Sequence, residues 1–178
     1  MFEPPPVSLL KFAIQLTIQR LTSAEPFHFS TCNFLFIFYT LLMNVADTEI
    51  KSLLETYQKI TVYGLSNDPS KPSHYVPVYI RDKGWEVVGT YPKEHSVGGF
   101  TIYPSLKDVP KEDRKFIDVF RSSDKIPEVI DEILTLGGTE VIWLQLGISH
   151  PEAEKKAEEA GIRVVSNRCL IIEHRNYF

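Results

Sequence analysis

Short apolar runs alternate with amphipathic segments from Asp47 onward. This alternation is the feature that most limits which folds the chain can adopt. Strands that are apolar on both faces and separated by helices are typical of a parallel sheet covered by helices on both faces. Because crossovers between parallel strands are right-handed, we expect a doubly wound, Rossmann-like α/β sheet of about five parallel strands in the order 3-2-1-4-5. The predicted strands, in chain order, are Ile60–Leu65, Trp85–Tyr91, Phe116–Phe120, Glu140–Leu146 and Arg163–Ser166.

Capping residues and glycines indicate where the helices begin and end. Apolar residues at helical spacing predict a helix from Asp47 or Thr48 to about Gln58. Three more helices are expected: Ser73–Lys83 with Ser73 as its N-cap, Ser122 or Ser123 to Leu136, and one from the start signal Ser149–Glu152 to Gly161. The segment Pro92–Pro104 is interpreted as a loop in which Phe100–Tyr103 is a short extended piece, and Cys169–Phe178 as a short exposed tail.

The first 42 residues differ in character from the rest. They contain an apolar run from Phe34 to Leu42 and only four charged residues, Glu3, Lys11, Arg20 and Glu25. A membrane helix needs about 20 apolar residues, and Phe27–Val45 reaches that length only by including polar ones. We therefore divide the chain into an N-terminal extension, 1–42, and one domain, 43–178. Our hypothesis is that translation starts at Met43; a targeting or membrane segment and a folded extension are the alternatives.

The composition of the chain excludes several classes of function. A net charge of −4 and a pI near 5.7 provide no basic face, so we expect no nucleic-acid partner. The two cysteines, Cys32 and Cys169, have no metal-binding spacing, and a reducing compartment fits them. We expect a cytoplasmic protein, or a mitochondrial one if residues 1–42 are a targeting segment. No H-E-x-x-H, C-x-x-C, G-x-S-x-G or P-loop pattern occurs, so no catalytic or metal-binding residue is predicted.

The turn after the first predicted strand is a candidate phosphate site. Gly64 and Ser66 lead into a helix N-terminus, where backbone N–H groups and the helix dipole favour anions. The G-x-G-x-x-G fingerprint of dinucleotide sites is incomplete, and the second predicted strand leads to Lys93 rather than to the acidic residue that holds an NAD ribose. A cation there suits a ribose that carries an extra phosphate, as in coenzyme A (CoA) or NADP.

Ligands of open parallel sheets bind beyond the carboxyl ends of the strands. The residues that follow the five predicted strands are therefore the candidate ligand-binding set. These residues are Gly64, Leu65, Ser66, Lys71 and Ser73; Thr90, Pro92 and Lys93; Phe120 and Arg121; Gln145 and Gly147; and Asn167, Arg168 and Cys169.

Several of these segments resemble one known family. The strings VYGLSNDPSKPSHYV, YPSLKDVP, IDVFRSSDKIPEVIDE, VIWLQLGI and NRCLIIEH resemble the small stand-alone CoA-binding domain proteins (the YccU-like group). That group is close in fold to the N-terminal domain of succinyl-CoA ligase α subunits. The resemblance covers about Glu49–His174.

The resemblance implies roles for the matching residues. Gly64 and Ser66 match the turn that receives the CoA phosphates, and Lys71-Pro72-Ser73 matches the family's Arg-Pro-Ser. Thr90–Lys93 is similar to the turn near the adenosine, although Tyr91 replaces an Asn. The strings Phe120-Arg121, Gln145-Leu146-Gly147 and Asn167-Arg168-Cys169 match Phe-Arg, Gln-Leu-Gly and Asp-Arg-Cys, with Asn for Asp in the last.

These matches imply binding of CoA or an acyl-CoA, with Lys93, Lys71 or Arg121 at the 3′-phosphate and the pantetheine arm running toward Cys169. The ligase's phosphorylated histidine lies in a second domain that this chain lacks, so no complete catalytic apparatus is expected. Two alternatives remain open: an NADP-linked oxidoreductase, and a thiol-redox or regulatory module that uses Cys169. A protein partner or a homo-oligomer is possible in each case.

Overall fold

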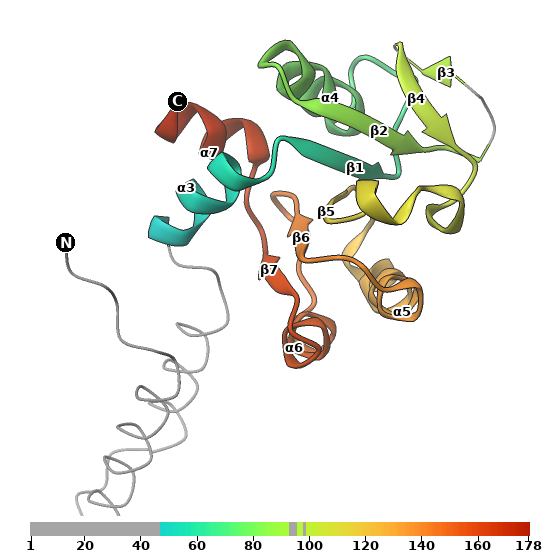
Figure 1. The fold of residues 1–178 in the computed structure, drawn as a ribbon, viewed down its shortest axis with the longest axis vertical. Helices are drawn as coiled ribbons and strands as arrows, with labels where there is room; N and C mark the ends of the chain where they lie inside the picture. Colours follow the sequence, from blue (N-terminus) through green and yellow to red (C-terminus); the bar gives the residue numbers. More distant parts are fainter. Residues whose placement is uncertain (1–46, 93–95, 98) are drawn as a thin grey trace, which may run out of the picture. The chain divides into compact units, whose positions relative to one another are not determined.

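The structure is a computed structural model that describes residues 47–92, 96–97 and 99–178. The predictions for residues 1–42 and for Lys93 lie outside these ranges. One seven-stranded sheet, in the order β3-β4-β2-β1-β5-β6-β7, forms the centre of the described part (Figure 1). Its strands are β1 (Lys59–Tyr63), β2 (Glu86–Thr90), β3 (Ser96–Val97), β4 (Phe100–Tyr103), β5 (Phe116–Val119), β6 (Val141–Leu144) and β7 (Arg163–Val165).

The expected doubly wound parallel sheet is confirmed. It has six parallel strands, one more than the five predicted, and the short strand β3 is added antiparallel at one edge. All neighbours are parallel except β3 and β4, which are antiparallel. The added parallel strand is β4, which pairs with β2. Numbered in chain order, the six parallel strands lie in the order 3-2-1-4-5-6, and β4 is strand 3. The predicted third strand, observed as β5, consequently lies beside β1 and not beside β2. Only Phe100 and Ile102 of β4 are buried, so its apolar signal in the sequence is weak.

Helices cover both faces of the sheet (Figure 1). The α-helices are α3 (Asp47–Thr56), α4 (Pro72–Asp82), α5 (Ile126–Leu136), α6 (Pro151–Glu159) and α7 (Leu170–Tyr177). Three short 3₁₀ turns complete the described elements: η1 (Leu106–Asp108), η2 (Lys111–Asp113) and η3 (Ser123–Lys125). In the described residues, no helix is both long enough and apolar enough to span a bilayer.

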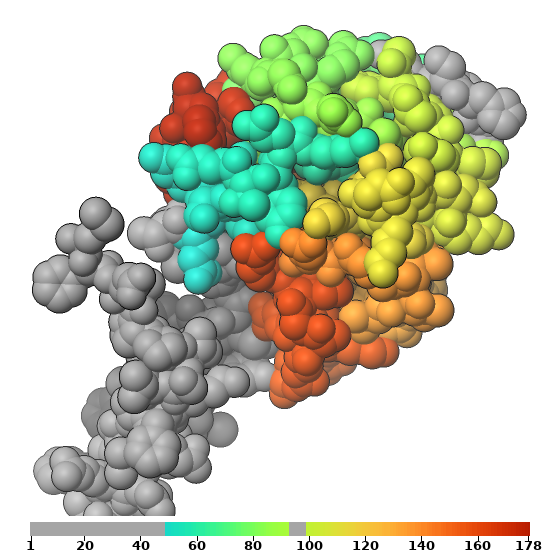
Figure 2. Space-filling model, in the orientation of Figure 1, coloured from blue at the N-terminus to red at the C-terminus, as the bar shows by residue number. Residues whose placement is uncertain are grey.

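Two apolar clusters separate the helices by face. Ile50, Ile80 and Leu170, from α3, α4 and α7, pack with Trp143 on one face of the sheet. The helices α5 and α6 pack with Ile142 and neighbouring residues on the other face. Figure 2 shows α3 and α7, which are far apart in sequence, side by side on the surface. Both sides of β1, β5 and β6 are therefore buried, as their continuous apolar sequences predict.

Two predictions about helix ends are wrong. The N-cap of α4 is Lys71, not Ser73, because Pro72 occupies the first helical position, where its fixed φ suits a helix start. The expected exposed tail is the helix α7, and Glu173 and His174 within it are buried. The helix is hard to recognise in the sequence, because half of its eight residues form a polar stretch, Glu173–Asn176, and the helical spacing of its apolar residues is short.

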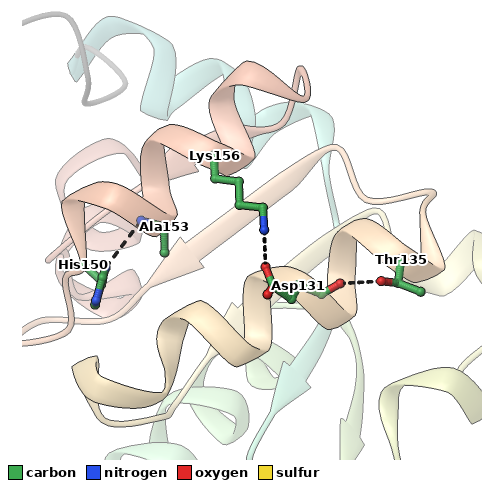
Figure 3. A network of polar contacts seen from close by, with 5 residues as sticks. All are labelled: Asp131, Thr135, His150, Ala153 and Lys156. Atoms are coloured by element: carbon green, nitrogen blue, oxygen red, sulfur yellow. Dashed lines mark hydrogen bonds and ion pairs between the residues drawn. The ribbon is translucent and has the colours of Figure 1, made fainter.

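The start signal predicted at Ser149–Glu152 is confirmed. The His150 side chain caps α6 by accepting a hydrogen bond from the Ala153 N–H group at 3.4 Å. Lys156 of this helix forms an ion pair of 2.7 Å with Asp131 of α5 (Figure 3). Because both partners are exposed, this pair contributes little stability, and burial of apolar residues under α5 and α6 holds the two helices on the sheet.

Candidate functional site

The carboxyl ends of β2, β1, β5, β6 and β7 lie side by side along one edge of the sheet. At about 4.8 Å between strands, the four steps from β2 to β7 span about 19 Å. The described candidate residues fall into two groups along this edge. One group surrounds Gly64, and the other surrounds Gln145.

Gly64 is the point where three strand ends meet. Its N–H group donates to the Thr90 Oγ1 atom at 3.3 Å, and this hydroxyl donates to the Val62 carbonyl at 3.4 Å. Gly64 has φ of +93°, and a Cβ atom there would lie 2.8 Å from the Phe120 carbonyl oxygen. Only glycine fits this close approach. The structure therefore brings together Gly64, Thr90 and Phe120, as the sequence predicted.

Leu65 belongs to the core through its side chain. It is buried, and it packs onto Gly89, where an added Cβ atom would lie 2.9 Å from the Leu65 Cδ2 atom. Only the backbone of Leu65 is then left to contact a ligand.

Ser66 is held by three hydrogen bonds. Its N–H group donates to the Ser73 carbonyl at 3.3 Å, and its hydroxyl accepts from the Asp68 N–H group at 3.2 Å. The His74 ring, through Nδ1, bonds the Ser66 carbonyl at 2.8 Å. The N–H groups of Gly64 and Ser66 are thus both used within the protein, which was not expected of a phosphate-binding turn. The contact of His74 with this turn was not predicted from the sequence.

Asp68 and Lys71 shape the exposed part of the same turn. The Asp68 carboxylate accepts from the Ser70 hydroxyl at 2.7 Å and from the Ser70 N–H group at 3.0 Å, and these bonds lower the pKa of Asp68. Lys71 is exposed, and its carbonyl accepts the N–H groups of His74 and Tyr75 at the start of α4. Lys71 is therefore the residue at the N-terminus of α4, the positive end of the helix, which favours an anionic ligand.

Arg121 follows β5 and lies beside a small pocket. Its guanidinium group is 5.5 Å from the centre of the Tyr63 ring. The Tyr63 hydroxyl donates a hydrogen bond to the Glu132 carboxylate at 2.7 Å. Burial is the larger cause, and this bond the second cause, of the rise in the pKa of Tyr63 to about 12. The pocket, of about 350 Å³, is lined by Tyr63, Arg121, Lys125, Glu128, Val129 and Glu132. Its mixture of charges offers no strong preference for an anion, since Lys125 is paired with Glu128 at 3.1 Å.

The second group joins the ends of β6 and β7. The Gly147 N–H group donates to the Asn167 Oδ1 atom at 2.7 Å. Asn167 has φ of +58°, a conformation that asparagine tolerates better than most residues. Cys169 is a half-buried free cysteine at the N-cap of α7. The structure thus brings Gly147, Asn167 and Cys169 to one place, while Pro92 is exposed at the far end of the edge, after β2.

Two observations modify the predicted charge of this edge. The Arg168 guanidinium group is 3.2 Å from the Glu173 carboxylate, so the charge of Arg168 is largely balanced. Among the described residues, Lys71 and Arg121 form no ion pair. They are the described cations at this edge whose charge is most available to a ligand.

Asp118, a carboxyl group beneath the second group, is not among the residues predicted from the sequence. It lies within β5, is completely buried, and accepts a hydrogen bond from Gln145 Nε2 at 2.8 Å. Burial raises the pKa of Asp118 to about 7, and the bond from Gln145 opposes this rise. The signal was present in the sequence as a single charged residue inside the apolar run Phe116–Phe120.

A larger pocket, of about 640 Å³, lies away from the predicted edge. It is formed where α3, α4 and α7 end, and it is lined by Leu54, Glu55, Gln58, Tyr79, Lys83, Trp85, His174, Arg175 and Phe178. The helix C-termini that meet there carry partial negative charge, which Lys83 and Arg175 offset. The pocket is therefore poorly suited to a polyanion, and the carboxyl edge remains the better candidate in spite of its smaller cavity.

Comparison with known proteins shows the family of this chain. Residues 58–175 match the model of the family described as "CoA binding domain". The chain belongs to this CoA-binding family. The matched range includes every candidate residue on the edge.

Two proteins are similar to three quarters of this chain along almost their whole own length. The uncharacterized protein YneT of Bacillus subtilis is 31% identical over 133 residues, which cover 75% of this chain and 97% of that protein. A solved structure from Thermus thermophilus has a TM-score of 0.69 and 39% identity, and it covers 75% of this chain and 100% of its own.

The chain is also similar to part of a larger enzyme. A dinucleotide-forming acetyl-coenzyme A synthetase of Ca. Korarchaeum cryptofilum, solved with phosphate and ADP, has a TM-score of 0.53 and 26% identity. The match covers 62% of this chain but only 26% of that enzyme. The similarity is therefore to one part of the synthetase.

Proposed function

We propose that this protein binds CoA or an acyl-CoA along the carboxyl edge of its sheet, without a complete catalytic apparatus of its own. The observation that carries the proposal is the convergence at Gly64, a residue without a side chain at the point where the ends of β1, β2 and β5 meet. A backbone surface of this kind lets a pyrophosphate approach closely. Membership of the CoA-binding family supports CoA as the ligand.

The positions of the charges refine the proposal. The N–H groups of Gly64, Ser66, His74 and Tyr75 are engaged within the protein, and Pro72 has none. We therefore assign the pyrophosphate to the Ser73 N–H group at the start of α4, the Ser66 hydroxyl and the Lys71 ammonium group. Lys71, Lys93 and Arg121 are the candidates for the 3′-phosphate. The pantetheine arm would run past Gln145 toward Cys169.

Calorimetric titration of the full chain with CoA, dephospho-CoA and NADP tests this assignment. We expect CoA to bind best, because dephospho-CoA lacks the 3′-phosphate and NADP lacks the pantetheine arm. Preference for NADP would instead support the oxidoreductase alternative. Replacement of Lys71, Lys93 and Arg121 by alanine, one at a time, identifies the partner of the 3′-phosphate as the residue whose loss weakens CoA but not dephospho-CoA.

Ser66→Asp should abolish CoA binding by placing a carboxylate against the phosphates. Ser52→Asp is the matched control, since it makes the same change at an exposed position in α3. We expect Ser52→Asp to bind CoA as the wild type does. Equal affinity in Ser66→Asp and the wild type would contradict the assigned phosphate position.

A thiol-exchange function is the second candidate, because Cys169 is half-buried at the edge and lies on the proposed path of the pantetheine arm. In this reaction the Cys169 thiolate attacks CoA disulfide, forms a protein–CoA mixed disulfide and releases one CoA thiolate. Mass spectrometry after incubation with CoA disulfide should show one CoA adduct on the Cys169 peptide. Loss of the adduct in Cys169→Ser, with CoA affinity retained, would separate this function from simple binding.

A further inference from the structure

A buried carboxyl group with an unpartnered oxygen lies under the Cys169 end of the edge. The Asp118 Oδ1 atom accepts from Gln145 Nε2 at 2.8 Å, whereas the buried Oδ2 atom has no hydrogen-bond partner within the described part of the chain. Buried polar atoms are nearly always hydrogen-bonded, and exceptions call for an explanation. Asp118 is not needed for packing, since an apolar side chain would fill the same place without this cost.

Gln145 connects this carboxyl group to α7. The Gln145 Oε1 atom accepts from the Leu170 N–H group at 3.3 Å. Leu170 is the first residue of α7 and follows the N-cap Cys169, so its N–H group has no partner inside the helix. Only the amide oxygen can accept this N–H group, which directs the amide nitrogen toward Asp118. Asp118, Gln145 and Leu170 thus form one chain of hydrogen bonds from the centre of the sheet to the edge.

We propose that Asp118 is a positioning residue of the CoA site: through Gln145 it holds the first turn of α7, and with it Cys169, in the arrangement that receives the pantetheine arm. This inference rests on the proposed function. Asp118 touches no ligand itself and acts through Gln145.

The charge of Asp118 decides whether the chain of hydrogen bonds is complete. When the carboxyl group is ionised, the observed bonds give an acceptor both to the Gln145 amide nitrogen and to the Leu170 N–H group. When it is protonated, its O–H group can bond Gln145 only if the amide turns over, and the amide nitrogen then faces the Leu170 N–H group, donor against donor. Without that turn, the O–H group itself lacks an acceptor. Protonation therefore leaves one buried donor unpaired. It also weakens the bond from Gln145, because a neutral carboxyl group is a weaker acceptor than a carboxylate, and with it the hold on α7.

Both forms of Asp118 are populated near neutral pH. Burial favours the neutral form and the Gln145 bond favours the ionised form, and together they place the pKa of Asp118 at about 7. The titratable and charged groups on the packed elements of this face include His74 and Tyr79 from α4 and Arg168, Glu173 and His174 at α7. None of these groups contributes to the pKa shift of Asp118, which is set by burial and by the hydrogen bond from Gln145.

The expected consequence is an affinity for CoA that rises with pH. If only the ionised form holds α7 in the binding arrangement, the competent fraction rises from about 0.1 at pH 6 to about 0.9 at pH 8, and the affinity rises by up to about ninefold. The CoA phosphate also titrates in this range. Comparison of the wild type with Asp118→Asn, which lacks the titrating group, removes that common contribution.

The first test needs no ligand and no variant. In the full-length protein, NMR follows the Asp118 carboxyl carbon and the Leu170 amide nitrogen from pH 5.5 to 8.5. We expect both signals to change with one midpoint near pH 7. A Leu170 amide that does not follow the Asp118 carboxyl group would overturn the proposal, whether or not CoA binds.

The second test is titration with CoA at pH 6 and pH 8 for the wild type, Asp118→Asn and the control Thr61→Val. Thr61 is equally buried, and its hydroxyl donates to the Asp113 carbonyl at 2.6 Å, so Thr61→Val also loses a buried hydrogen bond. We expect Asp118→Asn to lose most of the pH dependence and Thr61→Val to keep it. Equal pH dependence in all three proteins overturns the proposal. Coupled NMR titrations without CoA binding at either pH would instead refute the proposed function and leave the hydrogen-bond chain intact.

Discussion

At the scale of single residues, the carboxyl edge depends on the absence of a side chain at one position. Gly64 combines a positive φ with a close approach to the Phe120 carbonyl oxygen. A larger residue at this position would lower the free energy of unfolding in two ways, by straining the backbone and by pushing β1 away from β5. The two costs can be distinguished, because Gly161 has a similar φ of +86° with nothing within 4 Å of an added Cβ atom.

We predict that Gly161→Ala lowers the free energy of unfolding by about 1 kcal/mol, the lower end of the cost of a left-handed non-glycine residue. Gly64→Ala should cost at least about 1 kcal/mol more, because its Cβ atom also collides with backbone. Urea denaturation measures both values. Equal losses in the two variants would show that the turn relaxes without cost.

At the scale of elements, the buried carboxylate of Glu154 fastens α6, and the half-buried carboxylate of Glu158 destabilises it. Glu154 Oε1 accepts from Ser149 Oγ at 2.9 Å, from His150 N at 2.6 Å and from Ser166 Oγ at 2.7 Å. Glu158, one turn later, has no such partners among the residues that the structure describes. Burial first, and the charge of Glu154 second, raise the pKa of Glu158 to about 7.

The pKa of Glu158 predicts the sign of a pH effect on stability. A glutamate in the unfolded chain has a pKa of about 4.3. Because the folded value is higher, the contribution of Glu158 to stability is fully present below about pH 4.3 and is lost as the pH rises through about 7. Glu158→Gln should therefore be more stable than the wild type at pH 8, and this advantage should shrink toward pH 5.

Urea midpoints at pH 5 and pH 8 test the prediction for Glu158→Gln. Glu159→Gln is the control, since Glu159 is the exposed neighbour on the same helix. A shift of the same size in both variants at both pH values would mean that the effect is one of net charge.

At the scale of the whole molecule, ligand binding and folding are linked. The proposed site is assembled from the ends of five strands and the first turns of α4 and α7, which are adjacent only in the folded chain. A ligand that binds only the folded state stabilises it, by about 2.7 kcal/mol at a concentration 100 times the Kd.

We predict that CoA at such a concentration raises the Tm of the full chain by about 5–10 °C, given about 2–4 °C per kcal/mol for a protein of this size. Differential scanning fluorimetry measures the shift, with Ser66→Asp as the variant that should show none. An equal shift with inorganic phosphate alone would indicate an anion effect and not recognition of CoA.

The sequence by itself determined the fold class and most of the candidate edge. Strands such as β1, β5 and β6 are apolar on both faces, and this is a local property that reports burial between two layers of helices. Residues that directly follow such strands must lie at the carboxyl edge, so Gly64, Phe120 and Gln145 could be placed there without coordinates.

Only the tertiary structure decided which of these residues meet, and how. The short strand β4 becomes part of the sheet because β2 offers an unpaired edge, a fact absent from its own four residues. The N–H groups of Gly64 and Ser66 are engaged by Thr90 and Ser73, and Asp118 is joined to Leu170 through Gln145. A sequence pattern reports whether a segment is buried, because burial depends on its own composition. Hydrogen-bond partners depend on which distant segments are brought together, and that is settled only when the layers pack.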